Sequence, residues 1–205
     1  FIEGPIRIEN RALGYDLNYY LENFIIDYKQ GLTQYYGFTQ FNDAKEGNGE
    51  KKRFQKARKL AYKGSREHFF NALYHDRLKA EGFEVSLAED VEGFGRALTK
   101  LDADLYDSLE NGPSEISKML GFENYVYITY LNEIESAEYA GTNSMRLKGE
   151  KTPKLPQRSW IKLMDTEEPI IFEQNGYVVN PISFFSNGYW GYEKVAEMIP
   201  TNYQP

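Results

Sequence analysis

Polar and hydrophobic residues alternate with a period of two through residues 6–10, 15–24 and 32–41, a pattern typical of β-strands. In the second run, four large apolar side chains share one face: Tyr15, Leu17, Tyr19 and Leu21. A Lys-Gln-Gly segment at residues 29–31 supplies a turn before the third run. We therefore expect a hairpin or a three-stranded meander at the start of the chain.

The period changes to that of an α-helix in residues 51–82. A first helix has a narrow apolar face formed by Phe54, Ala57, Ala61 and Tyr62, with lysines on the opposite face. Gly64 interrupts this helix, and Ser65 is suited to cap a second one that ends before Gly82. The second helix has a broader apolar face, and the two together predict a helical hairpin.

Strand-like runs return downstream, at residues 83–87, 125–131, 160–163 and 170–172, and Asn175-Gly176 indicates a type I′ hairpin turn. Residues 88–124 show no pattern that we assign, and residues 140–158 predict a long surface excursion. We expect one α+β domain over residues 1–205, with a mostly antiparallel sheet. The helical hairpin at 51–82 is inserted in it and packs on one face of the sheet.

The composition allows a large hydrophobic core without covalent cross-links. The 205 residues include 17 Tyr, 13 Phe and 2 Trp, and a chain of this size buries roughly 70% of its unfolded surface. The absence of cysteine excludes disulfides and thiolate metal sites. No apolar run approaches the ~18 residues of a membrane helix, so we expect no transmembrane segment. The chain begins at Phe1, and we expect it to be an excised part of a longer product.

Charge is distributed unevenly along the chain. Residues 51–82 carry ten basic and three acidic side chains, whereas the remainder carries 14 basic and 28 acidic ones. Four lysines could contact phosphates: Lys52, Lys56, Lys59 and Lys63. Because they line the side of the first helix that faces away from Phe54, and because the rest of the chain is acidic, we interpret them as a solvated face and expect no nucleic-acid partner.

No set of residues specifies a reaction. His68 and His75 are seven positions apart, whereas chelation from a helix uses a spacing of three or four. Ser65 with His68 and Asp76 lacks the elbow sequence of a serine nucleophile. Acidic pairs such as Asp102 with Asp104, or Glu89 with Asp90, occur by chance among 31 acids. We therefore assign no catalytic residue, no metal site and no cofactor.

Five residues are candidates for binding. Tyr189, Trp190 and Tyr192, together with Trp160, could form a stacking platform for a sugar ring or a peptide proline, or could fill the core. Arg58 projects from the apolar side of the first helix. We expect it to pair with a carboxylate or with backbone carbonyls, and a ligand is the alternative.

Three motif blocks together carry a resemblance to a known family. They are Ile8-Glu9-Asn10-x2-Leu13-Gly14-Tyr15, Phe54-x3-Arg58-x2-Ala61-Tyr62-x-Gly64-Ser65-x2-His68-Phe69, and Gly188-Tyr189-Trp190 with its continuation to Tyr203-x-Pro205. With these blocks the chain resembles an uncharacterised family of Bacteroidota-type exported proteins, in which this domain follows a carboxypeptidase-regulatory-like β-sandwich.

The resemblance implies a periplasmic or outer-envelope location, with the upstream β-sandwich as a partner in the same chain. The carboxypeptidase label belongs to that sandwich, a non-catalytic accessory domain, so it transfers no catalytic residue. We expect a non-enzymatic cell-envelope module that binds a protein or glycan partner. The alternative is a hydrolase acting on cell-envelope glycan or peptide polymers. A hydrolase would show a deep cleft with convergent carboxylates, whereas a binding module would show a shallower patch.

Overall fold

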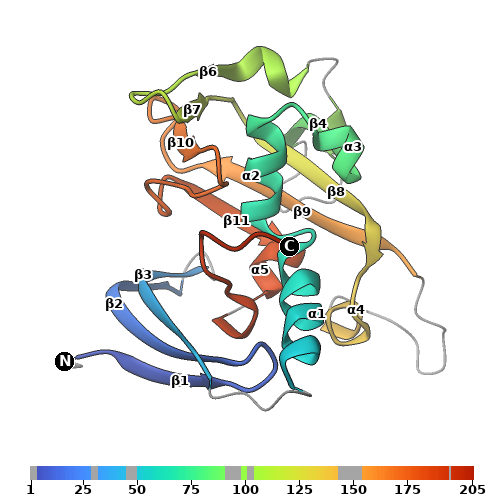
Figure 1. The fold of residues 1–205 in the computed structure, drawn as a ribbon. Coiled ribbons are helices and arrows are strands. Elements are labelled where there is room, and N and C mark those ends of the chain that lie inside the picture. The colour runs from blue at the N-terminus through green and yellow to red at the C-terminus, as the bar shows by residue number, and fades with distance from the viewer. Residues whose placement is uncertain are drawn as a thin grey trace. The chain divides into compact units, whose positions relative to one another are not determined.

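The computed structural model describes residues 4–28, 32–44, 50–90, 98–100, 104–142, 154–193 and 195–205. Within these residues every strand pairing is antiparallel, and the expected α+β class is confirmed. The chain divides into two compact units, Phe1–Tyr62 with Val195–Pro205, and Lys63–Lys194 (Figure 1). The first unit has one sheet and the second has two, and each unit has its own hydrophobic core.

The first unit contains the predicted meander. Its strands are β1 (Ile6–Asn10), β2 (Tyr15–Asp27) and β3 (Leu32–Asp43), which pair in that order. Tyr15, Leu17 and Tyr19 share a buried face, as their alternation predicts. That face supplies most of the apolar surface against which the rest of the unit packs.

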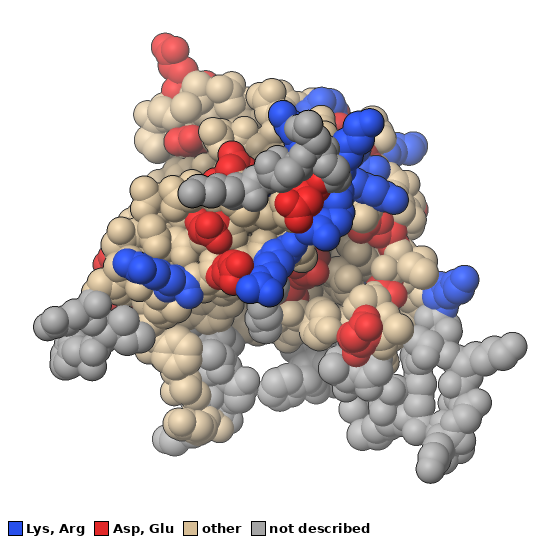
Figure 2. All heavy atoms as spheres, turned by 60° about the horizontal axis from the view of Figure 1, so that its bottom comes forward, with Lys and Arg blue, Asp and Glu red and all other residues tan. Residues whose placement is uncertain are grey.

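Helix α1 (Glu50–Tyr62) and the short 3₁₀ helix η2 (Val195–Glu197) complete this unit. The buried core consists of Leu13, Tyr15, Leu17, Tyr62 and Ile199. The opposite side of α1 carries exposed basic residues: Lys51, Lys52, Arg53, Lys56 and Lys59. Figure 2 shows Lys and Arg side chains gathered in a band that Asp and Glu side chains interrupt. The basic face of the helix is therefore solvated, as its periodicity predicts.

The second unit contains two sheets. The larger sheet has the order β11-β9-β8-β4-β5, and the smaller has the order β10-β7-β6. The strands of the larger sheet are β4 (Phe83–Asp90), β5 (Leu98–Lys100), β8 (Tyr125–Ile134), β9 (Pro156–Leu163) and β11 (Phe184–Gly188). Those of the smaller sheet are β6 (Leu109–Asn111), β7 (Ser117–Leu120) and β10 (Ile170–Glu173).

Helix α2 (Arg66–Tyr74) supplies the centre of this unit's core. Its Phe69 and Phe70 are fully buried together with Val126 and Ile161, which alternate with more exposed residues along β8 and β9. The remaining helices are α3 (Leu78–Glu81), α4 (Ala137–Thr142), α5 (Tyr189–Tyr192) and the 3₁₀ helix η1 (Leu105–Ser108).

The start of α2 is fixed by backbone contacts at two successive residues. Ser65 is the N-cap, as predicted, and its Oγ accepts a hydrogen bond from the backbone N–H of His68 at 3.1 Å. The backbone N–H of Gly64 donates to Nδ1 of His68 at 3.0 Å, and Nε1–H of Trp190 donates to the Gly64 carbonyl at 2.7 Å. Residues far apart in sequence therefore meet at this cap.

The structure divides the expected helical hairpin between the two units, because α1 ends at Tyr62 and α2 belongs to the second core. The second helix also stops earlier than its pattern predicts. Asp76 has a positive φ of 54°, and the N–H of Arg77 donates to the Ala72 carbonyl at 2.8 Å, which closes the helix end. The chain then restarts as α3, which ends before Gly82 as expected.

The other loop predictions have mixed outcomes. A turn forms at Asn175-Gly176, since the N–H of Gly176 donates to the Glu173 carbonyl at 2.8 Å, but the type I′ geometry is wrong, because Gly176 has a positive φ and Asn175 does not. The excursion expected at 140–158 falls largely on residues 143–153, which lie outside the described residues. The part of 88–124 that is described contains β5, η1, β6 and β7.

Replacing Gly64 tests the cap directly. Gly64 has a φ of +76°, and a Cβ there would lie 2.5 Å from Oε1 of Gln157 and 2.8 Å from the Tyr130 ring. We expect Gly64→Ala to lower the free energy of unfolding by about 2–4 kcal/mol, measured by urea denaturation. Gly121→Ala is the control, because its nearest neighbour would be 3.9 Å away, and it should change stability by about 0.5 kcal/mol or less. Equal losses of stability for Gly64→Ala and Gly121→Ala would contradict the role of Gly64 in the cap of α2.

Candidate functional site

The aromatic residues proposed as a platform do not form one surface. Trp190 is buried in the core, where its ring centroid lies 5.5 Å from that of Phe69. Tyr189 is also buried, and its ring meets Tyr139 edge-on at 5.1 Å. Tyr192 is half-buried and contacts the same Tyr139 ring at 5.2 Å. These three residues therefore make packing contacts with their own unit.

Trp160 lies on the other face of the larger sheet. Side chains alternate along β9, and the neighbouring Ser159 faces the core. Its Oγ accepts a hydrogen bond from the backbone N–H of Trp190 at 3.1 Å. Trp160 instead stacks on Tyr127 of β8, with centroids 6.4 Å apart and ring planes within 10°. The structure thus separates Trp160 from Trp190, and a binding role for Trp160 or Tyr192 stays a prediction.

Arg58 has the partners that its position on α1 predicts. Its Nε donates to the Leu13 carbonyl at 2.7 Å, and its Nη2 donates to the Gly14 carbonyl at 2.8 Å. Nη2 also lies 2.9 Å from Oδ1 of Asp43. The guanidinium is centred 3.8 Å from the Tyr15 ring centroid, and the side chain is only 13% exposed. These contacts hold α1 against the turn between β1 and β2.

The two histidines differ in environment. His68 is 5% exposed, whereas His75 is exposed. Burial lowers the pKa of His68, and the Glu81 carboxylate, 3.4 Å from Nε2, partly opposes this shift. Because Nδ1 accepts the Gly64 N–H, the neutral ring carries its proton on Nε2.

This geometry gives no support to a serine nucleophile at Ser65. Its Oγ accepts from the His68 backbone rather than contacting the ring, and the ring nitrogens face Gly64 and Glu81. Within the described residues, no three side chains among His, Asp and Glu converge on a point that could hold a metal ion. The helices of the described residues include none with the length and apolar character needed to cross a bilayer.

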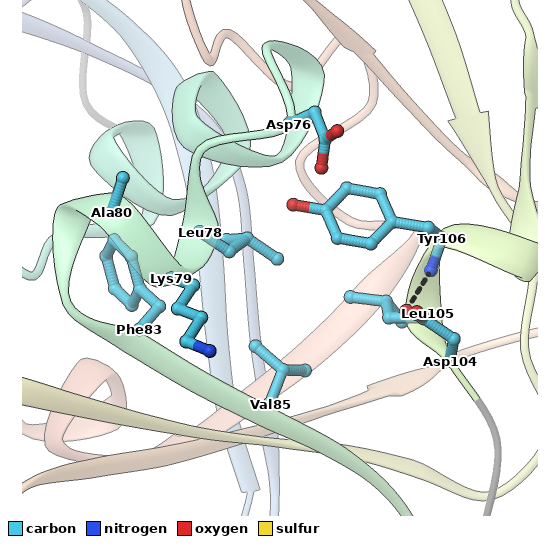
Figure 3. Close-up of a pocket in the computed structure, with 9 residues that line it drawn as sticks. All are labelled: Asp76, Leu78, Lys79, Ala80, Phe83, Val85, Asp104, Leu105 and Tyr106. Atoms are coloured by element: carbon cyan, nitrogen blue, oxygen red, sulfur yellow. Dashed lines mark hydrogen bonds between the residues drawn. The ribbon is translucent and has the colours of Figure 1, made fainter.

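A pocket of about 790 Å³ opens on the second unit (Figure 3). Its walls come from the connection between α2 and α3, from α3 itself, from β4 and from η1. It is lined by Asp76, Leu78, Lys79, Ala80, Phe83, Val85, Asp104, Leu105 and Tyr106. The volume lies in the range of small-molecule sites in proteins.

The rim of the pocket is polar and ordered by its own contacts. Oδ1 of Asp104 accepts the backbone N–H of Tyr106 at 3.0 Å, which begins the 3₁₀ helix η1. Figure 3 shows the Tyr106 hydroxyl directed toward Asp76. Burial raises the pKa of Tyr106 to about 12; a hydrogen bond with the Leu78 backbone opposes this shift, and Asp76 adds to it. The phenol is protonated at neutral pH, and its hydroxyl is hydrogen-bonded to Asp76.

The floor of the pocket is apolar. Leu78, Phe83 and Leu105 are buried core residues whose side chains reach its wall. The lining also includes two exposed acidic residues, Asp76 and Asp104, and one exposed lysine, Lys79. This arrangement suits a ligand with one apolar face and several hydrogen-bond donors.

The sequence carries only partial signals for this pocket. Asp104 is adjacent in pattern to Asp102, which lies outside the described residues, and Asp76 follows the Ser65 and His68 segment. No sequence pattern links either acid to Tyr106 or Lys79. The Asp-x-Tyr order at 104–106 is a local signal, because an aspartate commonly accepts the N–H two residues later. For the other pair, Glu89 and Asp90, the side chains are not described.

Comparison of the chain with family models, with curated proteins and with solved structures found no match in any of the three. The candidate site therefore stands on its own geometry.

Removing Arg58 should destabilise the first unit. Arg58→Ala leaves the carbonyls of Leu13 and Gly14 without their charged donor, so we expect a loss of about 2–4 kcal/mol in unfolding free energy. Lys56→Ala, on the exposed side of the same helix, is the control and should cost about 0.5 kcal/mol or less. An unchanged melting temperature for Arg58→Ala would show that the residue is not structural.

The lowered pKa of His68 should make stability depend on pH. The unfolded chain binds the proton more tightly, so this contribution is complete above the ordinary histidine pKa of 6.5 and declines as pH falls below it. Lys63 and Arg77 also favour the neutral ring, whereas Glu81 opposes it. Between pH 7.5 and pH 5.5, the free energy of unfolding measured with urea should fall more for the unmodified protein than for His68→Gln. His75→Gln should retain the full loss. Equal losses in all three proteins would refute the prediction.

Proposed function

We propose that the chain is a non-enzymatic cell-envelope module that binds a glycan or protein partner, and that the pocket beside Tyr106 receives the ligand. The observation that supports this proposal is the pocket itself, whose lining combines apolar side chains with two carboxylates, a phenol and an ammonium. The envelope location and the upstream β-sandwich partner rest on the resemblance of the three motif blocks.

The chemistry of the pocket favours a glycan over a protein side chain. A pyranose ring has an apolar face, which matches the floor at Leu105 and Val85, and hydroxyl donors, which match Asp76 and Asp104. An amino sugar adds an ammonium, which Asp76 and Asp104 attract and the single ammonium of Lys79 repels, so the two carboxylates outnumber the opposing charge. The volume of about 790 Å³ is sufficient for a disaccharide.

Binding is favoured over hydrolysis because of where the carboxylates lie. Asp76 and Asp104 are exposed residues, so water solvates their carboxylates. The general acid of a glycosidase typically sits in apolar surroundings, which keep it protonated at neutral pH. A hydrolase acting on cell-envelope polymers is therefore the second candidate.

Titration calorimetry with the β-1,4-linked disaccharide of glucosamine tests the proposal. We expect saturable binding, weaker binding of cellobiose, which lacks the ammonium groups, and weaker binding still of a lysine-containing tetrapeptide. Asp76→Asn should weaken disaccharide binding about tenfold, a change of about 1.4 kcal/mol. Asparagine tolerates the positive φ of residue 76, so this substitution removes charge while preserving the backbone.

Asp165→Asn is the matched control. Asp165 is exposed and accepts the N–H of Glu167 at 3.0 Å, a contact like that of Asp104, but it lies outside the pocket. It should leave binding unchanged. Tighter binding of the tetrapeptide would assign the pocket to a protein partner. Release of monosaccharide during the titration would favour the hydrolase, and absence of binding to all three probes would refute the pocket.

A further inference from the structure

About half of the β2–β3 hairpin extends past the end of β1, the strand that pairs with β2. The pairing of β1 with β2 ends at Ile6 with Tyr19, whereas β2 and β3 stay paired up to Asp27 with Leu32. Pro5 precedes β1 and has no backbone N–H to continue the ladder. Among the described residues, no strand therefore lies beside residues 20–27 of β2 on the side away from β3.

This extension exposes large apolar side chains on both of its faces. Phe24 is 53% exposed, Ile25 47% and Ile26 43%, and consecutive residues of a strand point to opposite faces. Tyr20 and Phe38 are exposed as well. Apolar residues gathered in this way typically mark an interaction surface.

The open edge also lacks the usual protection against pairing. Natural edge strands commonly carry lysine or proline, which discourage a further strand. Neither β2 nor β3 contains Lys, Arg or Pro, and residues 20–27 of β2 carry two acids, Glu22 and Asp27. The edge is thus open to a strand and negatively charged.

We propose that residues 20–27 of β2 accept an extended peptide strand from a partner protein, in which apolar and basic residues alternate. The unpaired backbone groups select an extended chain, the exposed faces select apolar side chains, and the acids select basic ones. A second copy fits less well, because pairing two copies of this hairpin brings acids together with no basic residue on either strand. This site belongs to the first unit and is independent of the pocket in the second.

Fluorescence anisotropy with three synthetic decapeptides tests the proposal. The first alternates valine and lysine, the second alternates valine and glutamate, and the third is the lysine peptide with alternate backbone nitrogens methylated. We expect saturable binding of the first peptide, at least tenfold weaker binding of the second, and loss of binding for the third. Hydrogen exchange of the amides in residues 20–26 should slow when the lysine peptide is bound.

Two variants and a matched control localise the site. Ile25→Lys should weaken binding of the lysine peptide at least tenfold, and Glu22→Lys, an exposed position, gives a second test if Ile25→Lys lowers the melting temperature. Leu131→Lys alters a residue that is 50% exposed in the second unit, and this variant should bind the lysine peptide as the unmodified protein does. Equal affinities for Ile25→Lys and Leu131→Lys would overturn the proposal. So would a dimer of the unmodified protein, detected by sedimentation, that Ile25→Lys abolishes.

Discussion

The peptide groups of Gly64 are held on both sides by side chains from elsewhere in the second unit. Its N–H donates to His68 and its carbonyl accepts from Trp190, a residue 126 positions later in the chain. The next residue, Ser65, caps α2. Because α2 supplies Phe69 and Phe70 to the core, the position of the core depends on this backbone geometry. The same contacts explain why one aromatic candidate, Trp190, and one histidine, His68, are buried rather than available to a ligand.

Arg58 has the equivalent role in the first unit. One guanidinium satisfies two carbonyls of the turn between β1 and β2 and reaches Asp43 at the end of β3. A buried cation is costly unless it is fully hydrogen-bonded, and these contacts meet that requirement. The lysines on the other side of α1 remain solvated. In both units, therefore, polar groups that the sequence singles out are used for folding: Arg58 in the first unit, and Ser65 and His68 in the second.

Local patterns predicted the secondary structure well where a single period dominates. The alternation of Tyr15, Leu17 and Tyr19 identified a strand and its buried face, and Ser65 identified the start of a helix, since both signals act over a few residues. The end of α2 was missed because Asp76 takes a backbone conformation more typical of glycine. The pocket was missed because Asp76 and Tyr106 are brought together only by tertiary packing. The platform failed geometrically because Trp160 and Ser159 are adjacent on β9 and so face opposite ways.

The dependence of the second unit on Gly64 can be measured by native-state hydrogen exchange of the whole chain. The indole Nε1–H of Trp190 and the backbone N–H of Gly64 should exchange only on complete unfolding of the unit, with a protection free energy equal to that from urea denaturation. The Tyr106 N–H, held by the exposed Asp104 at the pocket rim, should exchange faster through local opening. Exchange of the Trp190 indole as fast as the Tyr106 amide would contradict the central role of the Gly64 contacts.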